Sequence, residues 1–184
     1  STIEAASLVQ TAGTGTTTLR DDVTTTAAAG VNITAANINL DGLTIAASGD
    51  GVARFAGATV LNNDTVITTT GTGAITFTST LGSAANEDNT LALTGNTGNV
   101  VFTGAVGAGA NLELGAVSIV SAADVTASST IEAASLVQAA GSGTTTLTND
   151  VTTTAAAGVN ITAANITLDG LTIAASGDGV ARFA

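Results

Sequence analysis

Short runs in which apolar and polar residues alternate recur along the whole chain. Examples are Val31-Asn32-Ile33, Ile38-Asn39-Leu40, Leu43-Thr44-Ile45 and Val66-Ile67-Thr68, and Gly, Asn, Asp or Ser residues bound such runs. A period of two residues is typical of a β-strand with one buried face. Gly and Thr are frequent, and no sustained stripe at helical spacing is present. The pattern therefore predicts strands and turns, without helices.

One apolar position returns with a 22-residue spacing. Ile33, Phe55 and Phe77 follow one another at this spacing, and Phe102 comes after a slightly longer interval, which contains a polar segment around positions 83–88. A coil of this length cannot bury its own inward side chains, but stacked coils bury one another's. We therefore expect an internal ladder of like residues, which consists of Ile33, Phe55, Phe77, Phe102, Ile161 and Phe183.

A polar position recurs in step with the apolar one, with the same two spacings. Asn, Asp and Gly at one recurring position are typical of a corner, where left-handed or Asx-turn geometry is needed. The expected corner residues are Asp41, Gly42, Asn63, Asp64, Asp88 and Asn89.

A longer repeat encloses the short one. Residues 1–56 return as residues 129–184, an offset of 128, and only five of the 56 paired positions differ. The chain thus reads as one full repeat (1–128) and the start of a second (129–184), joined in one continuous rod without separate domains. We expect a β-solenoid with coils of about 22 residues, about six coils per repeat and eight to nine in the chain, as a window of a larger tandem array.

Two other folds are alternatives to the solenoid. A tandem of antiparallel β-sandwiches, one for each long repeat, fits less well because of the 22-residue period and the absence of Pro, Trp and Tyr. A trimeric β-roll built from three chains is a further alternative that the sequence leaves open.

Composition restricts the core and the partners. Hydrophobic residues form 45% of the chain but aromatic residues only 2%, so the core must be thin and built from small aliphatic side chains. Three Arg stand against 14 acids, which gives a net charge of −11. Such a chain lacks the basic patch that nucleic-acid binding needs, and anionic lipid repels it. The most apolar segment, residues 104–123, is Gly-rich and contains Asn111 and Glu113, so we expect no membrane span.

Several runs resemble a known family. Gly73-Ala74-Ile75-Thr76-Phe77-Thr78, residues 98–106 and Gly158-Val159-Asn160-Ile161-Thr162 are similar to the repeats of filamentous-haemagglutinin-like and autotransporter-type bacterial surface proteins. The resemblance covers essentially the whole chain and is one of composition and period. It implies a right-handed parallel β-helix, export to the cell surface or beyond, and a role as an adhesin stalk or surface fibre. The chain departs from the family in two features. Its coil has about 22 residues, whereas the family's commoner coil has about 19–20. Its 128-residue repeat is also near-identical from one copy to the next.

The inventory of catalytic side chains is small. The chain has no His, Cys, Lys or Tyr, so the usual bases and nucleophiles are missing. Two acidic pairs, Asp21-Asp22 and Glu87-Asp88, could serve glycoside hydrolysis. However, Asp21 is replaced by Asn149 in the second copy, so a pair needed in every repeat is not kept. We expect no catalytic residue and no enzyme.

Calcium is the one cofactor for which the sequence offers candidates. Asp64, Glu87 and Asp88 lie in oxygen-rich loops of the kind that calcium favours. The nonapeptide of calcium-binding β-rolls is absent, which favours Asx turns and solubilising charge instead. An ice-binding face would need a regular Thr array, but Ala46-Ala47-Ser48 interrupts the triplets at 24–26 and 68–70.

These observations together predict a function. We expect a structural section of a giant extracellular bacterial surface fibre or adhesin stalk, which gives length and rigidity. Its partners would be adjoining repeats or other copies of itself, stacked end to end, and a cell-surface or glycan ligand. The alternative is a calcium-, glycan- or ice-binding module of an adhesin.

Overall fold

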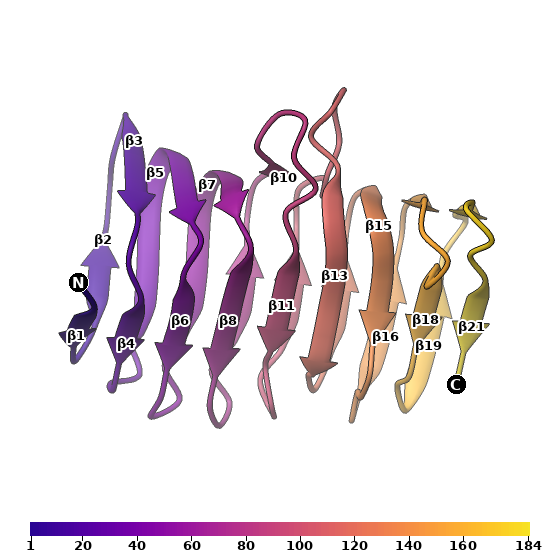
Figure 1. Ribbon diagram of the computed structural model, residues 1–184. Helices are drawn as coiled ribbons and strands as arrows, with labels where there is room; N and C mark the ends of the chain where they lie inside the picture. Colours follow the sequence, from indigo (N-terminus) through magenta and orange to yellow (C-terminus); the bar gives the residue numbers. More distant parts are fainter.

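The computed structural model describes residues 1–184 as a solenoid of 21 β-strands without a helix. Every strand pairing is parallel. In Figure 1 the colour passes steadily from one end of the rod to the other, with the two termini at opposite ends. Parallel strands stacked in about eight turns with a 22-residue period confirm the predicted β-solenoid.

Each turn has three sides, which we call faces 1, 2 and 3. Face 1 is the column of strands that pair successively from β1 to β21. It contains the end of the long strand β15 (Ile131–Gln138). Its other strands are β1 (Ile3–Ala5), β4 (Val23–Thr25), β6 (Thr44–Ala47), β8 (Thr65–Thr69), β11 (Leu91–Thr94), β13 (Leu114–Ser121), β18 (Val159–Ile161) and β21 (Ala181–Phe183).

Face 2 is the column that follows face 1 along the chain. Its strands are β2 (Leu8–Gln10), β9 (Ile75–Phe77), β12 (Val100–Phe102), β14 (Val125–Ala127), β16 (Thr144–Leu147) and β19 (Asn165–Leu168), together with the first halves of β5 (Val31–Asp41) and β7 (Ala53–Asn63).

Face 3 completes each turn. It holds β3 (Thr16–Leu19), the second halves of β5 and β7, β10 (Leu81–Ser83), the start of β15 (Ile131–Gln138), β17 (Val151–Thr153) and β20 (Ile173–Ala175). Val106 joins this column as a single bridge between Leu81 and Ile131. The long strands β5, β7 and β15 therefore run around a corner from one face to the next.

The alternation in the sequence sorts side chains between core and solvent. In β8, Thr65, Ile67 and Thr69 are buried, whereas Val66 between them is 41% exposed. The same rule along every column gathers 34 buried apolar residues into one cluster that runs inside the rod. Val, Ile, Leu and Ala fill most of this cluster. The core is therefore thin, as the composition predicts, and each coil depends on its neighbours for burial.

The aromatic ladder lies on face 2. Ile33 pairs with Phe55, Phe55 with Phe77, and Phe77 with Phe102, so the four side chains stand in register. The rings are stacked, with centroids 5.2 Å apart for Phe55 and Phe77 and 5.7 Å apart for Phe77 and Phe102. Such contacts contribute about 0.5–1.5 kcal/mol each beyond burial.

The ladder does not continue into the second copy as the sequence indicated. Phe102 pairs with Ala127, which pairs with Leu147, and Leu147 pairs with Leu168. Ile161 and Phe183 lie instead on face 1, above Gln138. The expectation failed because it assumed that one repeat spans a whole number of turns.

Counting faces along the chain gives the true length of the repeat. Ile3 lies on face 1 and its equivalent Ile131 on face 3, and the chain crosses 17 successive faces from one to the other. Seventeen faces at three per turn make five and two-thirds turns, which agrees with the expected count of about six but is not a whole number.

A small cavity marks the place where the aromatic column ends. It measures about 10 Å³ and is lined by Phe102, Ala127 and Gln138, among others. Ala127 follows Phe102 in the column, so the side-chain volume falls abruptly there. The Gln138 Oε1 atom accepts a hydrogen bond from the Thr145 hydroxyl at 2.7 Å, whereas its buried Nε2 atom has no hydrogen-bond partner.

The duplicated sequence shows how much the burial of a residue depends on the coil that covers it. Phe55 is fully buried, whereas its equivalent Phe183 in the last coil is 39% exposed. Leu40 and Leu168 differ in the same way, at 0% and 42%. Identical residues thus change from core to surface when the next coil is missing, so stacking alone supplies their burial.

We predict that Phe77→Ala lowers the free energy of unfolding by about 3–5 kcal/mol, because Phe77 is enclosed by rings on both sides. The matched control is Phe183→Ala, which removes a half-exposed ring at the end of the rod and should cost much less. Urea denaturation followed by circular dichroism measures both. Equal losses for the two variants would show that the Phe stack is not the centre of the core.

Candidate functional site

The corner between faces 3 and 1 collects the polar residues that the spacing singled out. Asp41 pairs with Asn63, and the Asn63 Nδ2 atom donates a hydrogen bond to the Asp41 Oδ1 atom at 2.8 Å. Gly42 follows in the left-handed region, with a φ of 66°. Asp88 and Asn89 lie just before β11, at the same corner two turns above Asp41 and Gly42.

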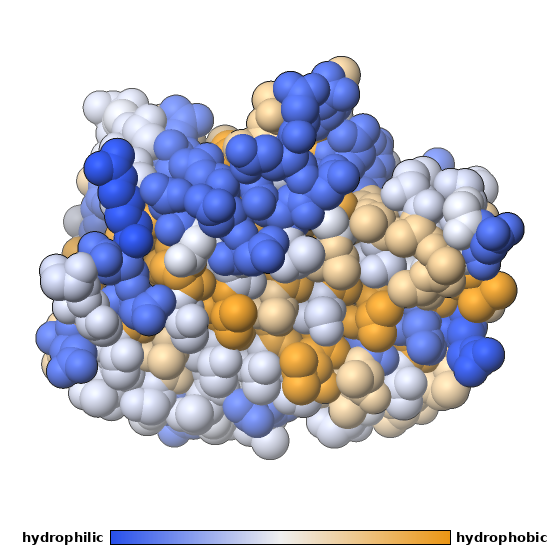
Figure 2. All heavy atoms as spheres, viewed as in Figure 1, coloured by the Kyte–Doolittle hydropathy of each residue, from blue (hydrophilic) through white to orange (hydrophobic).

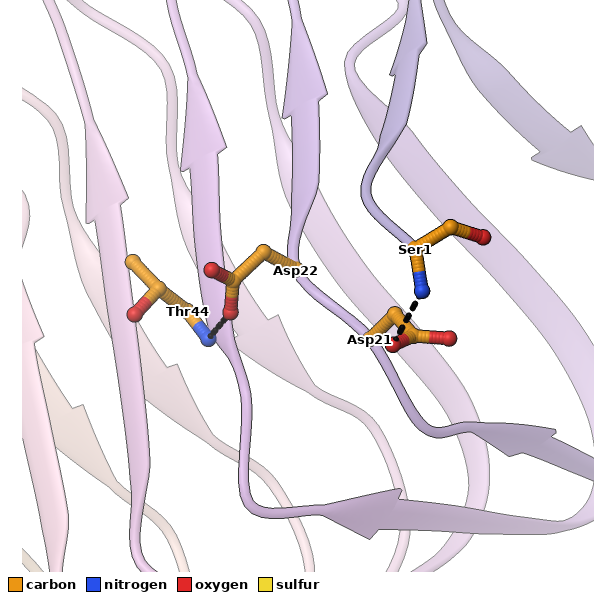
Figure 3. Close-up of polar contacts among 4 residues, drawn as sticks. All are labelled: Ser1, Asp21, Asp22 and Thr44. Carbon is orange, nitrogen blue, oxygen red and sulfur yellow. Dashed lines mark hydrogen bonds and ion pairs between the residues drawn. The ribbon is translucent and has the colours of Figure 1, made fainter.

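Aspartates at the corners join one coil to the next. The Asp22 carboxylate accepts a hydrogen bond from the Thr44 backbone N–H at 2.7 Å (Figure 3), and Asp64 accepts one from Thr90 at the same distance. A corner interrupts the backbone ladder, and an unpaired N–H group there needs another acceptor. The same contact occurs at other corners, between Asp50 and Thr72, Asp124 and Thr144, and Asp150 and Thr172.

Asn89 fixes the largest corner loop. Its Nδ2 atom lies 2.9 Å from the Leu61 carbonyl oxygen of the coil below, 3.1 Å from the Ser83 Oγ atom and 2.8 Å from the Glu87 Oε2 atom. The sequence predicts a turn here from the polar run 86–89. It gives no sign that one amide holds two coils and its own loop together, because the partners are a backbone oxygen and residues brought near by the fold.

Two loops rise above the rod beside β10 and β13 (Figure 1). The Asn86 N–H donates to the Asn111 carbonyl at 3.0 Å, so the loops contact each other. Both residues have positive φ values, 64° and 61°. Figure 2 shows hydrophilic residues gathered around these loops and the neighbouring corner. The longer interval before Phe102 and the polar segment around positions 83–88 indicate the first loop, but nothing in the sequence indicates its contact with the second.

Half of the acidic residues lie along this one corner, which we call the acidic ridge. Asp21, Asp22, Asp41, Asp64, Glu87, Asp88 and Glu113 form it. The calcium candidates Asp64, Glu87 and Asp88 belong to the ridge, but no three such side chains come together in a group that could hold a metal ion. Instead, Asp64 accepts from a backbone N–H, and Glu87 accepts from Asn89.

The acidic pair Asp21-Asp22 is divided between two contacts. Asp21 accepts a hydrogen bond from the Ser1 amino group at 2.6 Å, while Asp22 turns to Thr44 of the next coil (Figure 3). In the second copy, Asn149 replaces Asp21 and donates to the Ser128 carbonyl at 2.9 Å. The two copies therefore form different hydrogen bonds at this position.

The Thr triplets do not form a continuous outer array. Thr25 and Thr69, the middle residues of the triplets, are fully buried and point into the core. On the outside, Thr24 is followed by Ala46 and then Thr68 in the same column. Thr68 pairs with Thr94 in the next turn, and Thr94 pairs with Ser121, so Ala46 and Ser121 interrupt the Thr residues of this column.

Comparisons with known proteins give no further direction. No protein-family model matches the chain, and no curated protein or solved structure matches it either. The structure contains no helix with the length and hydrophobicity needed to cross a membrane. The function proposed below therefore rests on the fold and on its contacts.

We predict that Asp64→Ala destabilises the chain by about 1 kcal/mol, because the Thr90 N–H loses its acceptor. Asp64→Asn keeps an acceptor oxygen, as Asn99 does for the Asp124 N–H, and should be nearly neutral. Asp88→Ala is the matched control, since the Asp88 side chain makes no hydrogen bond. Thermal unfolding ranks the three variants. Each of them removes one negative charge, so equal losses of stability would contradict the prediction.

Proposed function

We propose that this chain is a structural section of an extracellular bacterial surface fibre or adhesin stalk, of the filamentous-haemagglutinin-like or autotransporter type. The observation that carries the proposal is the near-identical 128-residue repeat inside an uninterrupted solenoid. A repeat of this kind adds length in fixed steps, and its contacts go almost entirely to neighbouring coils. The chemistry of the corners also serves coil stacking.

Rigidity in this proposal comes from the direction of the hydrogen bonds. In parallel columns the backbone bonds run between coils, along the rod, and 113 backbone hydrogen bonds are present. Coils stack at about 4.8 Å, so the eight turns span about 40 Å. Bending the rod would open bonds on one side of every coil, so length and stiffness have the same source.

The exterior supports the same role. The net charge of −11 and the acidic ridge keep rods soluble and make them repel one another at a crowded surface. The ends of the chain differ from its sides, because their strands lack a partner and expose apolar residues such as Ile3 and Phe183. Unpaired strand ends are templates for further stacking. Adjoining repeats or further copies of the chain are therefore the partners that we propose.

We predict that adding or removing one 128-residue repeat in the native fibre changes its length by about 27 Å, at about 4.8 Å per turn. Cryo-electron microscopy measures the length and the axial layer line at about 4.8 Å. Antibodies against the chain should label intact cells along the same structures. Unchanged length, or a signal confined to the cell interior, would refute the fibre role.

We predict that the isolated chain associates end to end in a concentration-dependent way, measured by sedimentation velocity. Phe183→Lys places a charge among the inward residues of the open end and should reduce this association, as edge charges do. Val66→Lys, on the outside of face 1, is the control and should leave it unchanged. A wild-type chain that stays monomeric at high concentration would count against stacking of separate copies.

A further inference from the structure

The two copies of the repeated sequence lie on different faces of the rod. We infer that each 128-residue repeat is turned by one third of a revolution relative to the one before it, so that a tandem array presents every recurring surface feature on three sides. The strand pairings carry this inference. Ile3–Ala5 lies on face 1, whereas the equivalent Ile131–Ala133 lies on face 3.

The remaining segments shift in the same direction. Leu8–Gln10 belongs to face 2 and its equivalent at 136–138 to face 1. Thr16–Leu19 belongs to face 3 and its equivalent Thr144–Leu147 to face 2. Every segment of the second copy thus occupies the face that precedes, along the chain, the face of its counterpart.

The length of the connection between β14 and β15 leaves no room for another face. Only residues 128–130 separate Ala127 on face 2 from Ile131. Three residues suffice to turn a corner, but a strand across face 3 followed by a second corner would need several more. Ile131 must therefore take face 3, and the repeat must close at 17 faces.

The two copies keep the same local structure, although they lie at different positions around the rod. The turn that ends at Gly30 has a φ of 55° and lies between faces 1 and 2, and the same turn at Gly158 has a φ of 58° and lies between faces 3 and 1. Asp22 and Asp150 both accept from a Thr N–H at 2.7 Å, at different corners. The same turns and contacts therefore occur in both copies, at corners that the strand pairings show to be different.

The core tolerates the shift because the three faces pack in equivalent ways. Each face alternates inward and outward side chains in the same way, so an aliphatic segment fits any of them. At the five positions where the copies differ, neither residue is buried in either copy. The copies therefore bring the same core residues to two different columns, and the small cavity beside Ala127 is the local cost of joining unlike columns.

The consequence for an array rests on the proposed function, in which such repeats follow one another. Three repeats make 17 whole turns, and only then does a feature return to the same side. At about 4.8 Å per turn this period is about 80 Å. The acidic ridge would wind around the rod in three steps, so neighbouring rods or ligands meet it from any direction.

Disulfide trapping tests the rotation in the folded chain, which has no cysteine of its own. Thr126 and Thr146 are paired neighbours on face 2, with outward side chains. A Cα separation of about 4.8 Å lies within the range that a disulfide accepts. If the repeats were instead in phase, Val137 would lie above Thr126 on that face. The test variants are therefore T126C/T146C and T126C/V137C, with V101C/T126C, neighbours under either phase, as the matched control.

We expect T126C/T146C to oxidise about as fast as V101C/T126C, and T126C/V137C at least roughly tenfold more slowly, because its two positions lie on different faces. Quantification uses non-reducing gels and mass spectrometry of the linked peptides. Preferential linkage of Thr126 to Val137, or linkage in the control alone, would overturn the inference. The result is independent of the fibre role, since it is read in one chain and a rod with another duty would give the same disulfides.

Discussion

The parallel backbone hydrogen bond between successive coils is the interaction on which the rest of this structure depends. It sets the spacing along the axis, and that spacing brings like side chains into contact. Phe55, Phe77 and Phe102 can stack only because their strands are in register. Small aliphatic residues suffice elsewhere, because each is covered by its own face and by the coils above and below. A core with few aromatic residues is adequate for a fold in which every layer is thin.

Corners are the places where this interaction fails, and the polar chemistry of the chain is concentrated there. A strand that turns loses ladder partners, and Asp22, Asp64 and Asp124 supply oxygen atoms in their place. Asn89 provides the complementary donors. Of the acids that appear in the sequence as candidates for catalysis or calcium, Asp22, Asp64 and Glu87 thus accept hydrogen bonds within the fold.

The sequence predicted the fold from local and periodic signals, but it did not predict the phase of the long repeat. The 22-residue spacing of Ile33, Phe55 and Phe77 is visible because these residues are large and lie where coils have equal lengths. Between Phe102 and Ile131 no Phe marks the faces, and face 3 is represented there only by the bridge at Val106 and the pairing of Leu114 with Ala133. Loops of unequal length obscure the number of faces in one repeat. The sequence therefore does not distinguish a repeat of six turns from one of five and two-thirds turns.

Equivalence of the three faces explains why such a phase is tolerated. Equivalent segments of the two copies have the same alternation of inward and outward side chains and the same turn, as Gly30 and Gly158 show. Neither the alternation nor the turn depends on the face that the segment occupies. The unit of length change in this rod is therefore a single face, and not one whole coil. A duplication need only end in step with a face to keep all strands paired. Repeats that are not whole coils follow naturally, and rotation of the surface pattern along the rod follows with them.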